Sequence, residues 1–199
     1  MSRRAFFNEA AGKWDEKYGT PELACFLERL IPSFGLKPGQ KILDAGTGTG
    51  VLIPYLIQTV GPFGSITAID YAKEMVKICK SKYAQLLTVT VENQDVETLN
   101  FPSKCFDAVT CFGLFPHLEN KEKALLQMNR VLKKRGKLII AHALSSAEIK
   151  ARHKDVTLAV AKDTLPNEKE MNRLLNNAGF VDVCIRDEPG CYLCTSRKL

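Results

Sequence analysis

The chain has 199 residues and a net charge of +6, with 45% hydrophobic and 25% charged residues. This composition is ordinary for one globular domain that buries its own core. It argues against a membrane protein, because no segment approaches the ~18–20 uninterrupted apolar residues of a membrane span. Asn8, Glu9, Lys13 and Asp15 interrupt the N-terminal segment, so it lacks a signal-peptide core and we expect a cytoplasmic protein.

The first two thirds of the chain predict a helical N-terminus followed by alternating strands and helices. Within residues 1–37, Thr20 and Pro21 are typical of a helix start, and Pro32 and Gly35 of its end. Strands separated by helices of ~10–15 residues indicate a doubly wound parallel sheet with helices on both faces. The pattern predicts strands at 42–45, 65–70, 87–91, 106–112 and 137–141, and helices at 50–60, 72–85 and 120–132.

The last third has a different pattern. Residues 143–165 are irregular, although Ser145 and Glu148 form a capping box for a short helix. A helix at 168–177 is followed by strands at 181–187 and 191–197, and two strands so close in sequence can pair only antiparallel. We therefore predict an α/β fold with seven strands, mostly parallel, that ends in an antiparallel hairpin.

Seven cysteines are scattered through the chain, most of them inside apolar runs. In a cytoplasmic protein such residues are usually small buried hydrophobes rather than disulfide partners. Only Cys191 and Cys194 have the spacing of metal ligands, but positions three apart in a strand point to opposite faces. We therefore expect no metal, with a zinc or redox role for this pair as the alternative.

Basic residues gather in three small clusters, at 3–4, 133–135 and 197–198. The cluster at 133–135 precedes Gly136 at the end of a predicted helix, where cations suit the helix dipole. The sequence contains no zinc-finger, RRM or KH signature. We therefore interpret the clusters as solvated surface and expect no nucleic-acid partner.

A glycine-rich turn follows the first predicted strand. Asp44 ends the strand, and Gly46, Gly48 and Gly50 follow at alternate positions, which lets backbone N–H groups approach a ligand closely. A dinucleotide site needs G-x-G-x-x-G, and here the third glycine of that register is replaced by Val51. A carboxylate beside the turn disfavours a pyrophosphate and favours a cation. The turn predicts a positively charged ligand without phosphates.

The pattern Asp44-x-Gly46-x-Gly48-x-Gly50 resembles motif I of class I S-adenosylmethionine-dependent methyltransferases. The resemblance covers about residues 38–198. Segments 66–70, 93–96, 106–113 and 130–140 are similar, in this order, to the second strand, the end of the third strand, the fourth strand and the stretch before the fifth strand. The details are closest to the subgroup that resembles ubiquinone and menaquinone-biosynthesis methyltransferases (methyltransferase type 11). Lys134 and Arg135 replace the usual Pro-Gly, which should affect only the turn.

The resemblance implies a Rossmann-like sheet and S-adenosylmethionine as the cofactor. By this resemblance Asp70 binds both ribose hydroxyls, Asp95 binds the adenine amino group, and Asp44 acts through the turn, near the methionine ammonium. The alternatives are a strand-end cap for Asp70, an exposed turn acid for Asp95 and a core position for Met75. The expected cofactor-binding residues are Asp44, Ala45, Gly46, Thr47, Gly48, Gly50, Asp70, Tyr71, Met75, Asp95, Val96 and Phe112.

The resemblance also implies one domain over residues 1–199. Its parts are a helical cap at 1–37, a cofactor-binding core at 38–142, an acceptor-side insertion at 143–167, and a C-terminal helix and hairpin at 168–199. By analogy, residues 1–20 and 143–165 form a lid over the methyl acceptor. The aromatic residues of the first segment, Phe6, Phe7, Trp14 and Tyr18, can equally be core packing.

The implied activity is methyl transfer to a small-molecule acceptor by in-line displacement, which depends mainly on positioning and desolvation. A base is needed only when the acceptor must lose a proton. His117 follows the fourth predicted strand and His142 ends the fifth, so both lie at the carboxyl edge where ligands bind. These two are the catalytic candidates, with His153 as a third, and the alternative is an ordinary loop histidine.

Two rival functions use the same glycine turn. One is a non-catalytic sensor or partner subunit that only binds S-adenosylmethionine. The other is an NAD(P)-dependent oxidoreductase, which the glycine register disfavours. The small size of the chain favours a small-molecule acceptor, and we expect no nucleic acid, no membrane partner and a monomer or homodimer.

Overall fold

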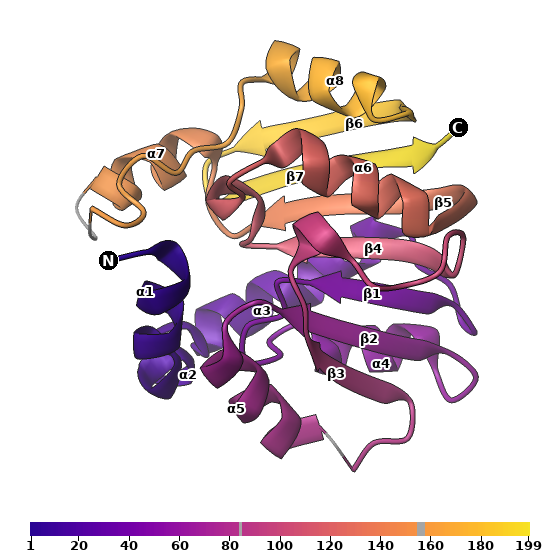
Figure 1. Cartoon of the computed structure of the whole chain (residues 1–199), viewed down its shortest axis with the longest axis horizontal. Coiled ribbons are helices and arrows are strands. Elements are labelled where there is room, and N and C mark those ends of the chain that lie inside the picture. Colours follow the sequence, from indigo (N-terminus) through magenta and orange to yellow (C-terminus); the bar gives the residue numbers. More distant parts are fainter. Residues whose placement is uncertain (84, 155–157) are drawn as a thin grey trace.

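Seven strands form one mixed sheet in the computed structural model, which describes residues 1–83, 85–154 and 158–199 (Figure 1). The strand order is β3-β2-β1-β4-β5-β7-β6. The first five strands pair in parallel, and β7 runs antiparallel to both neighbours. The strands are β1 (Lys41–Ala45), β2 (Ser65–Asp70), β3 (Val89–Asn93), β4 (Phe106–Phe112), β5 (Leu132–His142), β6 (Phe180–Glu188) and β7 (Cys191–Lys198). The predicted fold class is confirmed, including the C-terminal hairpin.

Helices cover both faces of this sheet because the central strands are apolar on both sides. On one face, Leu43 and Val109 pack against α6 (Lys121–Val131) and α8 (Glu168–Asn177). On the other face, the neighbouring Ile42 packs against α3 (Pro21–Leu30), α4 (Ile53–Val60) and α5 (Lys73–Tyr83). Within the described residues, no helix is both long enough and apolar enough to pass through a bilayer.

Short elements gather at the carboxyl edge of the parallel strands. Figure 1 shows α1 (Arg3–Ala10), α2 (Trp14–Tyr18) and α7 (Ser146–Lys154) together at this edge, with η1 (Ala11–Lys13) between the first two. The predicted caps are present: Thr20 Oγ1 accepts from Leu23 N at 3.3 Å, and Glu148 Oε2 accepts from Ser145 N at 2.8 Å. The remaining turns of 3₁₀ helix are η2 (Ile31–Phe34), η3 (Val96–Thr98) and η4 (Phe115–His117).

The glycine turn is longer than the sequence pattern predicted. Helix α4 begins at Ile53 rather than at residue 50. Gly48 and Gly50 have φ angles of +57° and +94°, which a right-handed helix does not allow. The chain therefore makes an extended turn over residues 46–52 before the helix starts.

The basic cluster at 133–135 lies in a strand and not at a helix end as predicted. Helix α6 ends at Val131, and β5 begins at once with Leu132. Phe106 of β4 pairs with Leu132 while Ala108 pairs with Lys137, so the residues between them form a bulge. The cluster is tied to acidic side chains there, with Lys133 Nζ 2.6 Å from Asp107 Oδ1.

The cysteines of the described residues are free thiols. Cys191 and Cys194 of β7 are both buried, and they belong to the two apolar clusters on opposite faces of the sheet. The prediction that their side chains diverge is therefore confirmed.

Gly64→Ala should lower the free energy of unfolding by about 1–3 kcal/mol, because overpacking forces the neighbours apart. An added Cβ would lie 2.5 Å from Val60 Cβ and 2.8 Å from the carbonyl oxygen of Gln40, next to the start of β2. Gly12→Ala is the matched control, since its Cβ would meet nothing within 4 Å. Urea denaturation of both variants measures the difference, and equal losses would contradict this account.

Candidate active site

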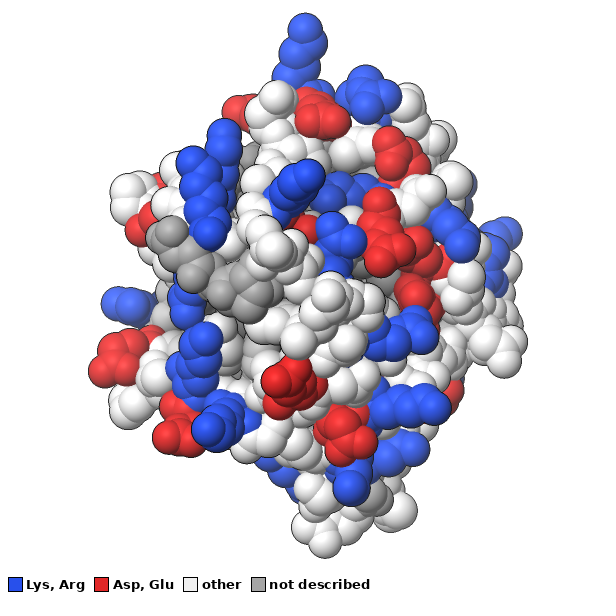
Figure 2. All heavy atoms as spheres, turned by 60° about the vertical axis from the view of Figure 1, so that its left-hand side comes forward, with Lys and Arg blue, Asp and Glu red and all other residues white. Residues whose placement is uncertain are grey.

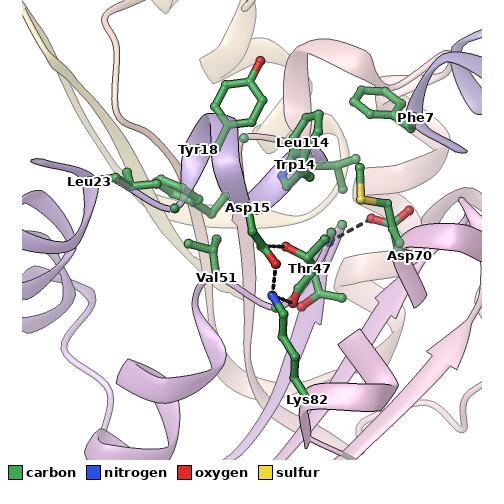
Figure 3. A pocket seen from close by; sticks show the side chains of 18 of the residues that line it. Phe7, Trp14, Asp15, Tyr18, Leu23, Thr47, Val51, Asp70, Lys82 and Leu114 are labelled. Atoms are coloured by element: carbon green, nitrogen blue, oxygen red, sulfur yellow. Dashed lines mark hydrogen bonds and ion pairs between the residues drawn. The ribbon is translucent and has the colours of Figure 1, made fainter. Parts of the chain in front are cut away.

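Three cavities adjoin at the carboxyl edge of the sheet. The turn cavity, of about 170 Å³, lies between the glycine turn and α2 (Figure 3). The η3 cavity, of about 330 Å³, extends from the same turn toward η3. The histidine cavity, of about 110 Å³, lies between α1, α2 and α7. One residue, His117, lines all three cavities.

The glycines of the turn have different surroundings. An added Cβ on Gly50 would lie 2.5 Å from the ring of Tyr83 and 3.0 Å from Cys79 Sγ, so Gly50 lets α5 pack against the turn. At Gly48 the nearest atom to an added Cβ is Trp14 Nε1 at 3.6 Å, so there is space above this residue. Gly48 therefore presents bare backbone to the turn cavity.

Asp70 ends β2 with its carboxylate held by two backbone amides. Oδ2 accepts from Gly48 N at 3.0 Å, and Oδ1 accepts from Ala72 N at 2.8 Å. Burial raises the pKa of Asp70 to about 6, although both N–H groups favour the ionised form. Each oxygen keeps a lone pair for another donor. Since Asp70 lines both the turn cavity and the η3 cavity, it can accept two hydroxyl groups of one ligand.

Asp44 lies beneath the glycine turn rather than on a cavity wall. It is 1% exposed, and its Oδ1 accepts from Thr110 Oγ1 at 2.7 Å. Oδ2 has no hydrogen-bond partner among the described residues. Burial raises the pKa of Asp44 to about 6, and the charge of Asp70 acts in the same sense. Central strand β1 is buried on both sides, so Asp44 and the neighbouring Ala45 do not line the turn cavity or the η3 cavity.

Asp95 also lines the η3 cavity. Its Oδ1 accepts from Glu97 N at 2.9 Å and so caps η3, while its Oδ2 lies 3.4 Å from Arg4 Nη2. Its side chain is 36% exposed. Asp95 is therefore both a helix cap and an acceptor that a ligand in the cavity can reach.

The N-terminal helices cover the turn cavity. Trp14, Asp15 and Tyr18 line it, and Figure 3 shows Asp15 between the turn and the end of α5. Asp15 accepts from Thr49 Oγ1 at 2.6 Å and pairs with Lys82 Nζ at 2.5 Å. These contacts fasten α2 over the glycine turn. Neither charged residue is among the predicted site residues, because the two are 67 positions apart and form no local pattern.

All three histidines line the histidine cavity. The rings of His117 and His153 are 4.9 Å apart. Burial lowers the pKa of His142 to about 3, and it also lowers the pKa of His117, so both are neutral at pH 7. His142 Nδ1 has no partner among the residues described. Over the same described ranges, no group of three or more His, Cys, Asp or Glu is arranged to hold a metal.

The predicted site residues therefore come together except for the two in β1. On the walls of the turn and η3 cavities lie Gly46, Thr47, Gly48, Gly50, Asp70, Tyr71, Met75, Asp95, Val96 and Phe112. Gly113 and Leu114 follow β4 and also line the turn cavity, but they are not among the predicted cofactor-binding residues. Their position just after a predicted parallel strand was the available signal.

Comparisons with known proteins agree with this geometry. Residues 36–179 match the family described as "Methyltransferase domain". The chain is 28% identical to demethylmenaquinone methyltransferase of Staphylococcus aureus, over 82% of this chain and 77% of that protein. The structure resembles an S-adenosylmethionine-dependent methyltransferase from Aquifex aeolicus, with a TM-score of 0.71, 27% identity, and coverage of 86% of this chain and 89% of that one.

A third similar structure is an N-methyltransferase from Haemonchus contortus in complex with phosphomonomethylethanolamine and S-adenosylhomocysteine. Its TM-score is 0.74 at 18% identity, and the match covers 90% of this chain and 43% of that one. The glycine turn, the strand order and the family match lead to one conclusion. The chain belongs to the methyltransferase-domain family, and it is a class I methyltransferase that depends on S-adenosylmethionine.

Proposed function

We propose that the protein transfers a methyl group from S-adenosylmethionine to a small-molecule acceptor held in the histidine cavity, by in-line displacement. The observation that carries this proposal is the junction between the cavities. Phe7, Trp14, Tyr18, Gly113 and His117 line both the turn cavity and the histidine cavity. A cofactor in the first and an acceptor in the second would therefore meet at shared walls.

The residues of the turn and η3 cavities fit S-adenosylmethionine. Asp70 offers two carboxylate oxygens to the ribose diol, and Asp95 with Val96 would hold the adenine. The hydroxyl of Tyr71, which lines the turn cavity, is buried and has no hydrogen-bond partner among the described residues. Buried polar groups are normally satisfied, so this hydroxyl suits a polar ligand.

Asp44 would act on the cofactor through its charge. It lies behind the turn, where its carboxylate makes the potential above Gly46 and Gly48 more negative. The methionine end of the cofactor carries an ammonium and a sulfonium, so this position favours it without direct contact. We therefore propose that Asp44 acts through the glycine turn, as the resemblance implies, and that other groups contact the methionine ammonium directly.

When bound, the cofactor supplies a methyl group on a positively charged sulfur, which a lone pair of the acceptor displaces. The protein's contribution is to position the acceptor and to exclude water. Trp14 and Tyr18, whose rings are 4.4 Å apart, cover the cavities, and Phe7 packs on Trp14. Neutral His117 and His142 are available to take a proton from the acceptor.

The walls of the histidine cavity suit a small acceptor. They are mainly aromatic, with Phe6, Phe7, Trp14 and Tyr18 beside the histidines. The name of the S. aureus relative refers to a demethylmenaquinone, a ring-bearing acceptor, which is compatible with these walls. The small volume favours a small molecule over a nucleic acid.

The surface charges support the same view of the partners. Figure 2 shows basic side chains interspersed with acidic ones rather than gathered in one field. Arg135 pairs with Asp182 at 2.8 Å, as Lys133 does with Asp107. We infer a cytoplasmic enzyme, monomeric or homodimeric, without a nucleic-acid or membrane partner. The division of the chain into cap, core, insertion and C-terminal part stays a prediction.

Asp70→Ala should weaken the binding of S-adenosylhomocysteine by about 1–3 kcal/mol, because charge-assisted hydrogen bonds to the ribose are lost. Isothermal titration calorimetry measures the change. Glu122→Ala, on the exposed start of α6, is the control and should bind as the wild type does. Binding of NADH in place of S-adenosylhomocysteine would overturn the proposed function, and an unchanged affinity in Asp70→Ala would remove this residue from the site.

The affinity for S-adenosylhomocysteine should decrease as the pH is lowered. The ligand's hydroxyls donate to the ionised carboxylate, and Asp70 of the free protein takes up a proton as the pH drops through about 6. Between about pH 7.5 and about pH 5, the dissociation constant should rise about tenfold. Asp70→Asn, which cannot titrate, should bind more weakly at high pH and vary less with pH. A constant affinity in the wild type would show that the ligand does not bind the ionised carboxylate.

A further inference from the structure

Asp163 is a buried acid that joins three elements behind the histidine cavity. It is 2% exposed and lies in the segment after α7. From α1, Arg3 donates to it through Nε at 2.9 Å and through Nη2 at 2.5 Å. His117 Nδ1 lies 2.8 Å from Asp163 Oδ2, and His153 Nδ1 lies 2.6 Å from its backbone oxygen. Asp163 itself is not on the cavity wall.

These contacts decide which nitrogen of His117 carries the proton. An ionised carboxylate is only an acceptor, so the facing Nδ1 of His117 must be the donor. In a neutral imidazole the other nitrogen, Nε2, then has the free lone pair. His117 also lines the histidine cavity, whereas Asp163 does not. With Nδ1 directed at Asp163, Nε2 is the ring nitrogen whose lone pair is left for a ligand.

We propose, resting on the function proposed above, that Asp163 is a positioning residue that holds His117 as an Nδ1-protonated base for the methyl acceptor. The acceptor is then a protic nucleophile, with an O–H, N–H or S–H group. Its proton passes to Nε2 of His117, and the freed electron pair forms the bond to the methyl carbon. The bond from that carbon to sulfur breaks, and its electron pair stays on sulfur.

The charges around the pair support this assignment. Burial raises the pKa of Asp163, but the hydrogen bonds from His117 and Arg3 outweigh it and lower the pKa overall. Burial lowers the pKa of His117, and the hydrogen bond to Asp163 opposes this change. At neutral pH the acid is therefore charged and the imidazole neutral. The other groups that face the pair are Arg3 of α1, Glu119 and Lys121 near the start of α6, His142 of β5 and His153 of α7.

Asp163→Asn should reverse the tautomer of His117. An amide has one accepting oxygen and one donating nitrogen, and the donors of Arg3 require the oxygen. The amide nitrogen then faces His117 Nδ1, which must accept, so the proton moves to Nε2. The pKa of His117 should also fall by about 1 unit, because an adjacent negative charge is lost.

Long-range ¹H–¹⁵N NMR spectra of the side chains measure both effects, and the chain has only three histidines to assign. The wild type should show His117 protonated on Nδ1, and Asp163→Asn should show it protonated on Nε2. Arg3→Gln is the matched control: it releases α1 but keeps the carboxylate, so His117 should stay protonated on Nδ1. An Nε2 proton in the wild type, or the same reversal in Arg3→Gln, would overturn the proposal.

The same wild-type sample is titrated with S-adenosylhomocysteine to separate the two proposals. Absence of binding overturns the proposed function, and the inference that rests on it falls too. Binding together with an Nε2-protonated His117 overturns the inference alone. If Asp163→Asn does not fold, the wild-type spectrum and Arg3→Gln still decide between the two tautomers.

Discussion

The hydrogen bond from the amide of Gly48 to the carboxylate of Asp70 connects the turn after β1 with the end of β2. Gly48 makes this bond with a positive φ angle of +57°, a conformation that glycine adopts without a steric penalty. The bond fixes the wall that the turn and η3 cavities share, since Asp70 lines both. The position of the proposed ribose site, and through it the direction in which a methyl group would face the histidines, depends on this contact.

Much of the fold could be predicted because the strands of the core are short apolar runs bounded by turn residues. The start of α4 and the position of the 133–135 cluster differ from the prediction, and both depend on backbone conformation. Arg135 has a φ of +61° within the bulge of β5, and a non-glycine residue in this conformation leaves no mark in the sequence. The glycine spacing indicated the turn after β1 correctly but could not give its length.

The candidate site was predictable where its residues end a strand, as Asp70 does, or lie in the short segment after one, as His117 does. It was not predictable where long-range charge pairs complete it. Arg3 and Asp163 are 160 positions apart, and Asp163 lies in an irregular segment without periodicity. Asp44 was identified by the motif, but its side chain does not line the turn cavity or the η3 cavity, because β1 is buried on both faces.

The way the N-terminal helices are attached has a kinetic consequence. Helices α1 and α2 contain no fully buried residue, and besides the packing of Phe7 and Trp14 they are held over the cavities by the ion pairs of Asp15 with Lys82 and of Arg3 with Asp163. Dissolved ions screen exposed charges over about 8 Å at physiological ionic strength and affect buried charges much less. Salt therefore weakens the half-exposed ion pair of Asp15 with Lys82 more than the buried pair of Arg3 with Asp163. Opening for cofactor exchange would begin at α2 and accelerate with ionic strength, while α1 stays closed over the histidines.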